Sequence, residues 1–270
     1  MSPSWRGGSF GRASRCVLAP NPSVMTLDGT NTWVLRAEVG GPSYVVDPGP
    51  LDDAHLARVA EEAGDVRGVL LTHGHADHSE GARALAERVG CGVRALDPAH
   101  RLGSEGLVEE DVVDLGGWEV RVVATPGHTA DSLSFLLPAE GAVLTGDTVL
   151  GRGTTVVAHP DGELGAYLSS LDRLHALAAA HELSSIWPGH GPVIDDALPV
   201  LDFYIAHRRE RLEQVREALR SLSGEASYDD LVARDALARA VVERVYVDVD
   251  PVLWGAAELS VRAQLAYLVG

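Results

Sequence analysis

One segment constrains the fold more than any other part of the chain: residues 72–81, which read THGHADHSEG. It places four metal-binding side chains within six residues, namely His73, His75, Asp77 and His78. Imidazole and carboxylate together suit zinc or a related divalent metal, and the lack of Cys in the run argues against a closed structural zinc finger. The apolar residues 66–71 predict a buried strand whose end delivers these ligands to a loop.

Three further candidate ligands follow apolar, strand-like segments in the same way. They are His128 in the sequence TPGHT, Asp147 in TGDT and His190 in PGHG. Glycine beside each ligand lets the backbone turn sharply at a strand end and leaves the side chain exposed. Seven candidate ligands from four loops are enough for two metal ions that each keep an open position, with one carboxylate between them.

Other polar residues near strand ends have ordinary explanations. Asp47 follows the apolar residues 44–46, where it could orient the ligands, but an Asp before Pro-Gly is also a common turn opener. A single histidine is more often a satisfied polar residue than a ligand. We place four histidines in that class, namely His55, His100, His175 and His181.

The formal charge of −17 bears on the kind of partner. A protein that binds nucleic acid without sequence preference gains most of its affinity from cations that neutralise phosphates. All 22 cations of this chain are Arg, and their one local concentration, residues 208–220, alternates with Glu. On a helix, one apolar face would hold Ile205, Leu212, Val215, Leu219 and Leu222. The arginines therefore favour a solvated, ion-paired face over a phosphate track.

The sequence also bears on the cellular compartment. No apolar run has the length of a membrane span, and the first residues lack the apolar core of a secretion signal. We therefore expect a cytoplasmic protein without a membrane partner, in which residues 1–13 form a loose tail. Cys16 and Cys91 are too few for a disulfide framework and are expected to be packing residues. The sequence leaves the oligomeric state open.

The order of predicted elements is that of an α/β protein. Strands are expected at residues 15–18, 32–36, 44–47, 66–71, 93–96, 112–115, 120–124, 132–137, 142–145 and 185–187. Helices are expected at residues 53–63, 80–89, 164–180, 200–222, 228–233, 236–247 and 253–268. This alternation suits two sheets that pack face to face with helices outside.

The motifs resemble those of the metallo-β-lactamase-fold hydrolases, whose five motifs match Asp47, residues 73–78, His128, Asp147 and His190 in order. Within that superfamily, residues 21–32, 151–155 and 204–208 resemble the lactamase-beta-like protein 2 group, which is related to glyoxalase II. The resemblance implies an αββα sandwich over residues 1–204. A small C-terminal helical, winged-helix-like domain would follow over residues 205–270.

The resemblance also implies a role for each ligand. His73, His75 and His128 would hold one zinc ion, Asp77, His78 and His190 would hold the other, and Asp147 would bridge them. Asp47 would orient the loop and its ligands. The implied reaction is hydrolysis by a hydroxide that bridges the two Zn²⁺ ions and is steered by Asp77, and Mn or Fe could replace zinc.

Two enzyme activities remain open, and their substrates differ in charge. The lactamase-beta-like protein 2 resemblance implies an endoribonuclease on single-stranded RNA, with Thr154, Thr155, His207 and Arg208 near the scissile phosphate. The acidic composition better suits a hydrolase of a small-molecule thioester, ester or lactone. In both cases, Asn31 and Thr32 are expected to line the cleft. A third possibility is a binding module without catalytic activity, in which metals hold loops and the C-terminal helices recruit a protein.

Overall fold

The structure is a computed structural model that describes residues 4–103, 106–223 and 235–269. Two β-sheets form its centre. The first has the order β1 (Gly8–Phe10), β2 (Ser14–Leu18), β3 (Asn31–Leu35), β4 (Ser43–Val46), β5 (Val66–Leu70) and β6 (Gly92–Arg94). The second has the order β11 (Ser185–Pro188), β10 (Ala142–Gly146), β9 (Leu133–Leu137), β8 (Glu119–Ala124) and β7 (Val112–Asp114).

Both sheets are mixed. Strands β1 to β4 pair antiparallel, and β5 and β6 add parallel to β4. In the second sheet β7 to β10 pair antiparallel, and β11 pairs parallel with β10. Parallel neighbours leave the sheet at the same edge. β5 runs parallel to β4, and β11 runs parallel to β10. The loops that follow the strands of each pair therefore leave the sheet at the same edge.

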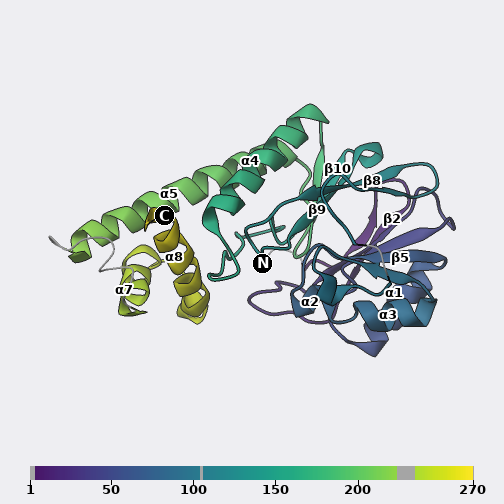
Figure 1. The fold of residues 1–270 in the computed structure, drawn as a ribbon, viewed down its shortest axis with the longest axis horizontal. Coiled ribbons are helices and arrows are strands. Elements are labelled where there is room, and N and C mark those ends of the chain that lie inside the picture. The colour runs from purple at the N-terminus through teal and green to yellow at the C-terminus, as the bar shows by residue number, and fades with distance from the viewer. Residues whose placement is uncertain (1–3, 104–105, 224–234, 270) are drawn as a thin grey trace.

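Helices cover the outer face of each sheet (Figure 1). α1 (Asp53–Ala63) and α3 (Ala82–Val89) bury Leu56 and Leu85 against Val45 and Val69 of the first sheet. α4 (Leu164–Ala180) and α5 (Ala197–Ser223) cover the second sheet. The short α2 (Ala76–Ser79) lies in the loop after β5. The layers therefore follow the expected order of helix, sheet, sheet and helix.

Besides the apolar clusters between each sheet and its helices, a further apolar layer lies between the two sheets. Trp33 of β3 stacks on Trp187 of β11, with ring centroids 4.8 Å apart and planes 16° apart. Phe135 and Leu144 of the second sheet belong to the same buried cluster. Each of these aromatic side chains removes a large apolar surface from water, which holds the sheets face to face.

The predicted boundaries are close to those observed, and α1 and α4 have the predicted ends. α1 begins after Asp52, whose carboxylate accepts from the His55 amide, and it ends at Gly64 with a φ of 67°. α4 begins after Glu163, whose carboxylate accepts from the amides of Gly165 and Ala166. Such caps satisfy amides that have no partner inside the helix, so they mark helix ends in the sequence.

The prediction of a loose tail over residues 1–13 is wrong for residues 8–10. This segment forms β1 and pairs with β2. Phe10 lies 5.5 Å from Trp33, and the Trp5 indole donates a hydrogen bond to Asn31. Partial burial of two aromatic rings fixes a segment that is too short and too rich in glycine to show a strand pattern.

The C-terminal part is helical where the structure describes it. α7 (Asp235–Val245) and α8 (Trp254–Val269) pack on the last turns of α5 through Val215, Leu219 and Val241. Figure 1 shows α5 running from the sandwich to these two helices without a break at the expected boundary of residues 204 and 205. The predicted helix 228–233 lies outside the described residues, and the two-domain division and winged-helix-like character stay predictions.

Within residues 4–103, 106–223 and 235–269, no helix combines the length and the apolar character needed to span a membrane.

Candidate metal centre

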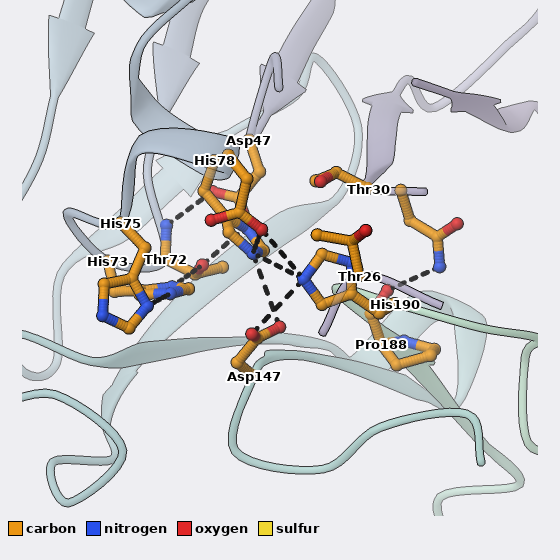
Figure 2. Close-up of polar contacts among 12 residues, drawn as sticks. Thr26, Thr30, Asp47, Thr72, His73, His75, His78, Asp147, Pro188 and His190 are labelled. Carbon is orange, nitrogen blue, oxygen red and sulfur yellow. Dashed lines mark hydrogen bonds and ion pairs between the residues drawn. The ribbon is translucent and has the colours of Figure 1, made fainter. Parts of the chain in front are cut away.

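Seven side chains converge where loops from the two sheets meet. Figure 2 labels five of them, namely His73, His75, His78, Asp147 and His190. His73 and His75 lie between β5 and α2, and α2 carries Asp77 and His78. The second sheet contributes His128 after β8, Asp147 after β10 and His190 after β11. These are the seven ligands predicted from the sequence, and each follows the end of a buried strand.

The ligand atoms form three overlapping groups, in each of which they lie within 4.8 Å of one another. The groups are His73 with His75 and His128, His73 with His78 and Asp147, and Asp77 with His78 and His190. Asp147 lies between them, because its carboxylate is 3.7 Å from His128 Nε2 and 3.4 Å from the Nε2 atoms of His78 and His190. This arrangement suits two cations that share one carboxylate.

The distances between ligand atoms are compatible with bound cations. His73 Nε2 lies 3.0 Å from His75 Nδ1, and His78 Nε2 lies 3.2 Å from His190 Nε2. Paired imidazole nitrogens at such distances require a shared proton or cation, because two lone pairs repel. Asp147 Oδ1 is buried and has no hydrogen-bond partner among the described residues. Imidazole and carboxylate donors fit zinc and similar divalent ions.

The other ring nitrogen of four histidines has a partner that orients the ring. His73 Nδ1 is 3.0 Å from Thr72 Oγ1, and His78 Nδ1 is 2.9 Å from Asp47 Oδ2. His128 Nδ1 is 2.8 Å from the Val156 carbonyl, and His190 Nδ1 is 3.1 Å from the Gly29 carbonyl. These partners aim the four Nε2 atoms at the centre.

Asp47 connects the first sheet to the ligands. It has a φ of 50°, and its carboxylate accepts from the Thr72 amide at 2.8 Å and from the Thr72 hydroxyl at 2.6 Å. Its second oxygen also faces His78. The carboxylate therefore holds the start of the ligand loop and one ligand at the same time.

Glycines beside the ligands leave no room for a side chain. A Cβ on Gly189 would lie 2.5 Å from Asp147 Oδ1 and 2.8 Å from His78 Cε1. Gly127 has a φ of 131°, and a Cβ there would lie 2.3 Å from the backbone of Tyr167. The glycines of the sequence motifs are thus required by close approach as well as by the turn.

Charge divides the histidines of the centre into two classes. Burial disfavours the imidazolium of His190, but the Asp147 carboxylate outweighs it and raises the pKa of His190 to about 9. The pKa of His78 is also raised against burial, by Asp147 and Asp47. Burial lowers the pKa of His73 and of His128. In the metal-free protein, protons therefore collect around Asp147 on the His78 and His190 side.

We expect zinc binding to release protons. A proton on His190 must leave before its nitrogen can bind a cation, so the release should be large near about pH 7 and should shrink as the pH rises through 9. The raised pKa also stabilises the metal-free fold below pH 6.5, and this stabilisation is lost as the pH rises through about 9. Titration calorimetry in buffers of different ionisation enthalpy measures the release. A release that stays constant up to about pH 10 would contradict this reading.

Asn31 and Thr32 do not line a cleft, contrary to the prediction. Both are fully buried. The Asn31 amide donates to the carbonyls of Pro188 and Gly191, at 2.9 and 2.8 Å, and thereby joins β3 to the His190 loop. The Thr32 hydroxyl lies 3.0 Å from His55 Nε2. A hairpin position next to the site suggested exposure, but packing between the sheets buries these side chains.

The four residues predicted near a scissile phosphate lie in two places. Thr154 and Thr155 belong to the loop after β10, where Thr154 is half-buried and Thr155 is buried. On α5, His207 stacks on Phe203 at 5.7 Å, and Arg208 is buried with its guanidinium donating to the Thr155 carbonyl. The prediction that Arg208 contacts substrate is wrong, because its charge points into the protein.

A cavity of about 270 Å³ adjoins His75 and was not anticipated. Its walls include His100, Thr129 and three carboxylates, those of Asp97, Asp131 and Asp161. His100 packs against Gly74, where a Cβ would lie 2.6 Å from its Nε2. No local pattern distinguishes this histidine in the sequence, since a separate loop brings it to the ligand run.

Comparison with known proteins agrees with this geometry. The family model described as "Metallo-beta-lactamase superfamily" matches residues 25–181. The chain belongs to the metallo-beta-lactamase superfamily. It is 33% identical to the Beta-lactamase-like protein 2 homolog of Drosophila melanogaster, over 93% of this chain and 86% of the relative. The resemblance stated from the sequence motifs is thereby confirmed.

Two further proteins are similar to this chain. The Atrochrysone carboxyl ACP thioesterase of Aspergillus fumigatus is 34% identical over 77% of this chain and 65% of the relative. A beta-lactamase domain protein from Burkholderia ambifaria superposes with a TM-score of 0.74 at 24% identity, over 98% of this chain and 89% of that one. The predicted sandwich fold is confirmed. Metallo-beta-lactamase superfamily members are metal-dependent hydrolases, which confirms the predicted enzyme class.

Proposed function

We propose that this hydrolase binds two divalent metal ions, with zinc as the first candidate, and cleaves a small-molecule thioester or ester. The observation that carries the proposal is the position of Asp147 between two sets of histidines. His73, His75 and His128 would hold one ion. Asp77, His78 and His190 would hold the other, and Asp147 would contact both. Mn or Fe would fit the same donors.

Two bound divalent ions would supply an acidified water and a polarised carbonyl oxygen. The protein's own groups would position the reactants. Asp77 Oδ2 lies 3.1 Å from His190 Nε2, and its side chain is 29% exposed, so it faces both the centre and the solvent. Its carboxylate can orient the attacking water. Burial raises the pKa of Asp77, but the hydrogen bond with His190 and the charge of His78 outweigh burial and leave the pKa lowered, in keeping with an ionised group.

The charged residues around the cavity beside His75 support a neutral or weakly charged substrate. Asp97, Asp131 and Asp161 line the cavity beside His75. Arg152, at the loop after β10, is 2.6 Å from Asp28, and Arg208 is buried. An RNA backbone would meet carboxylates here, whereas cleavage of RNA depends on cations that neutralise phosphates. A thioesterase among the relatives agrees with this choice.

The second candidate is the endoribonuclease on single-stranded RNA, which rests on the likeness to beta-lactamase-like protein 2 homologs. Membership of a hydrolase superfamily disfavours the third possibility, a binding module without catalytic activity.

Parallel assays would decide between the two substrates. Purified, zinc-loaded enzyme would be given an acyl thioester of pantetheine and, separately, a short fluorogenic RNA, each at low and high salt. We expect thioester turnover that changes less than about twofold with salt, because no phosphates are neutralised. Enzyme freed of metal by a chelator is the control for contaminating activities. RNA cleavage that requires the metal and falls steeply with salt, without thioester turnover, would replace this proposal by the second candidate.

A further inference from the structure

The loop between Asp147 and Val156 connects two parts of the metal centre. Asp147 at its start lies between the two ligand groups. Val156 near its end accepts the hydrogen bond of His128 Nδ1 at 2.8 Å. The residues between them, 148–155, contain no helix or strand. The position of His128 therefore depends on what holds this loop.

Three side chains from the outer helices hold the loop. The Tyr167 hydroxyl of α4 donates to the Thr148 carbonyl at 2.7 Å. The Tyr204 hydroxyl of α5 accepts from the Leu150 amide at 2.9 Å and donates to the Gly153 carbonyl at 3.1 Å. The Arg208 guanidinium donates to the Thr155 carbonyl. These contacts follow the loop from the Asp147 end to the Val156 end.

Arg208 is an unusual residue to find in this position. It is 7% exposed, and its guanidinium lies 5.1 Å from the centre of the Tyr167 ring. None of the carboxylates described in the structure forms an ion pair with it within 4.0 Å, and its Nε has no hydrogen-bond partner among the described residues. A buried charge held by one carbonyl and one ring is costly for stability alone. Its contact with the residue before Val156 gives it a second role.

We infer that Arg208 is a positioning residue for the metal centre, which fixes Thr155 so that the neighbouring Val156 carbonyl keeps His128 aimed at its metal ion. The inference rests on the metal-binding part of the proposed function and is independent of the substrate. It makes the long helix α5 part of the metal centre through Tyr204 and Arg208. Loss of a group that bonds a ligating histidine directly weakens metal binding by about 10- to 100-fold in other metal sites, and Arg208 acts one residue further out.

Metal titration of four proteins tests the inference without any assay of activity. They are metal-free wild type, Arg208→Met, Arg208→Lys and the control Arg209→Met, which alters an exposed arginine at the next position of α5. Competition with a chromogenic chelator gives the stepwise Zn²⁺ affinities. We expect Arg208→Met to weaken the binding of one of the two ions by about 10-fold, the lower end of that range, and to leave the binding of the other close to wild type. Arg208→Lys should restore part of the loss, since an ammonium can also donate to the Thr155 carbonyl.

A general loosening of the fold would lower the affinity for both ions together. A selective loss of affinity for one ion therefore distinguishes a positioning role of Arg208 from a purely stabilising one. Tyr204→Phe removes only a hydroxyl that holds the same loop, and it should weaken the same ion to a smaller extent. If Arg208→Met does not fold, the Tyr204→Phe variant tests the inference in its place. Two ions bound with wild-type affinity in both variants, or an equal loss of both ions, would overturn the inference alone. Wild-type protein that bound no ion would overturn the proposed function with it.

Discussion

An Asp147→Ala variant is expected to lose turnover by about a thousandfold or more, because a bound ion lowers the pKa of its water to near 7. Asp147 is the carboxylate that approaches both ligand groups, being within 3.7 Å of His128 and 3.4 Å of His78 and His190. Without it, neither group keeps its shared anionic donor. The expected cause of inactivity is therefore loss of metal rather than loss of fold.

The fold should survive this substitution, since Asp147 follows β10 and its side chain takes no part in the apolar layers. Metal content by atomic spectrometry, circular dichroism and kcat on the thioester substrate together separate the two causes. Asp65→Ala is the matched control, because Asp65 forms a solvent-exposed pair with Arg67. His128→Ala should behave like Asp147→Ala. Near-normal turnover in either ligand variant would show that the centre has been assigned wrongly.

Asp47→Ala should damage both stability and metal binding. The carboxylate is almost fully buried and accepts from the Thr72 amide, the Thr72 hydroxyl and His78. Its removal leaves buried donors without a partner, at an expected cost of about 3 kcal/mol in the free energy of unfolding. Zinc affinity should fall by about 10- to 100-fold, as found when a partner of a ligating histidine is lost.

Asp47→Asn distinguishes shape from charge in this position. The amide has the same size, but its nitrogen cannot accept a hydrogen bond, so it can replace one carboxylate oxygen and not both. We expect a stability between those of wild type and Asp47→Ala in urea unfolding of the metal-free protein. The zinc affinity should still be lowered. An Asn variant with wild-type affinity for both ions would mean that Asp47 is an ordinary turn residue.

The convergence of the seven predicted metal ligands was predictable because they follow short apolar runs, and five of the seven stand beside a glycine. That pattern is local, and the family motif adds their order along the chain. The ends of α1 and α4 were predictable for a similar reason, since Asp52 and Glu163 cap the helices with their own side chains. Local chemistry therefore determines both the strand-end ligands and the helix starts.

The remaining features depend on tertiary contacts. Asn31 is polar and lies next to the site, but it faces the interior and joins β3 to the His190 loop. The buried stripe of α5 includes Leu201, Tyr204, Arg208 and Leu212, whereas the stripe inferred from the sequence began at Ile205 and omitted Arg208. Helical spacing alone would have placed Arg208 on that stripe, and its charge argued against doing so.

The positions of the ligand groups also affect how the protein would unfold. His73, His75, Asp77 and His78 follow the first sheet, whereas His128, Asp147 and His190 follow the second. Every proposed ion would thus cross-link the two halves of the sandwich, and the halves could not separate without releasing it. Loading with metal should then raise the free energy of unfolding of the whole domain, by an amount that grows with free metal concentration. The cofactor would serve as a structural tie between sheets whose main contact is otherwise the apolar layer around Trp33 and Trp187.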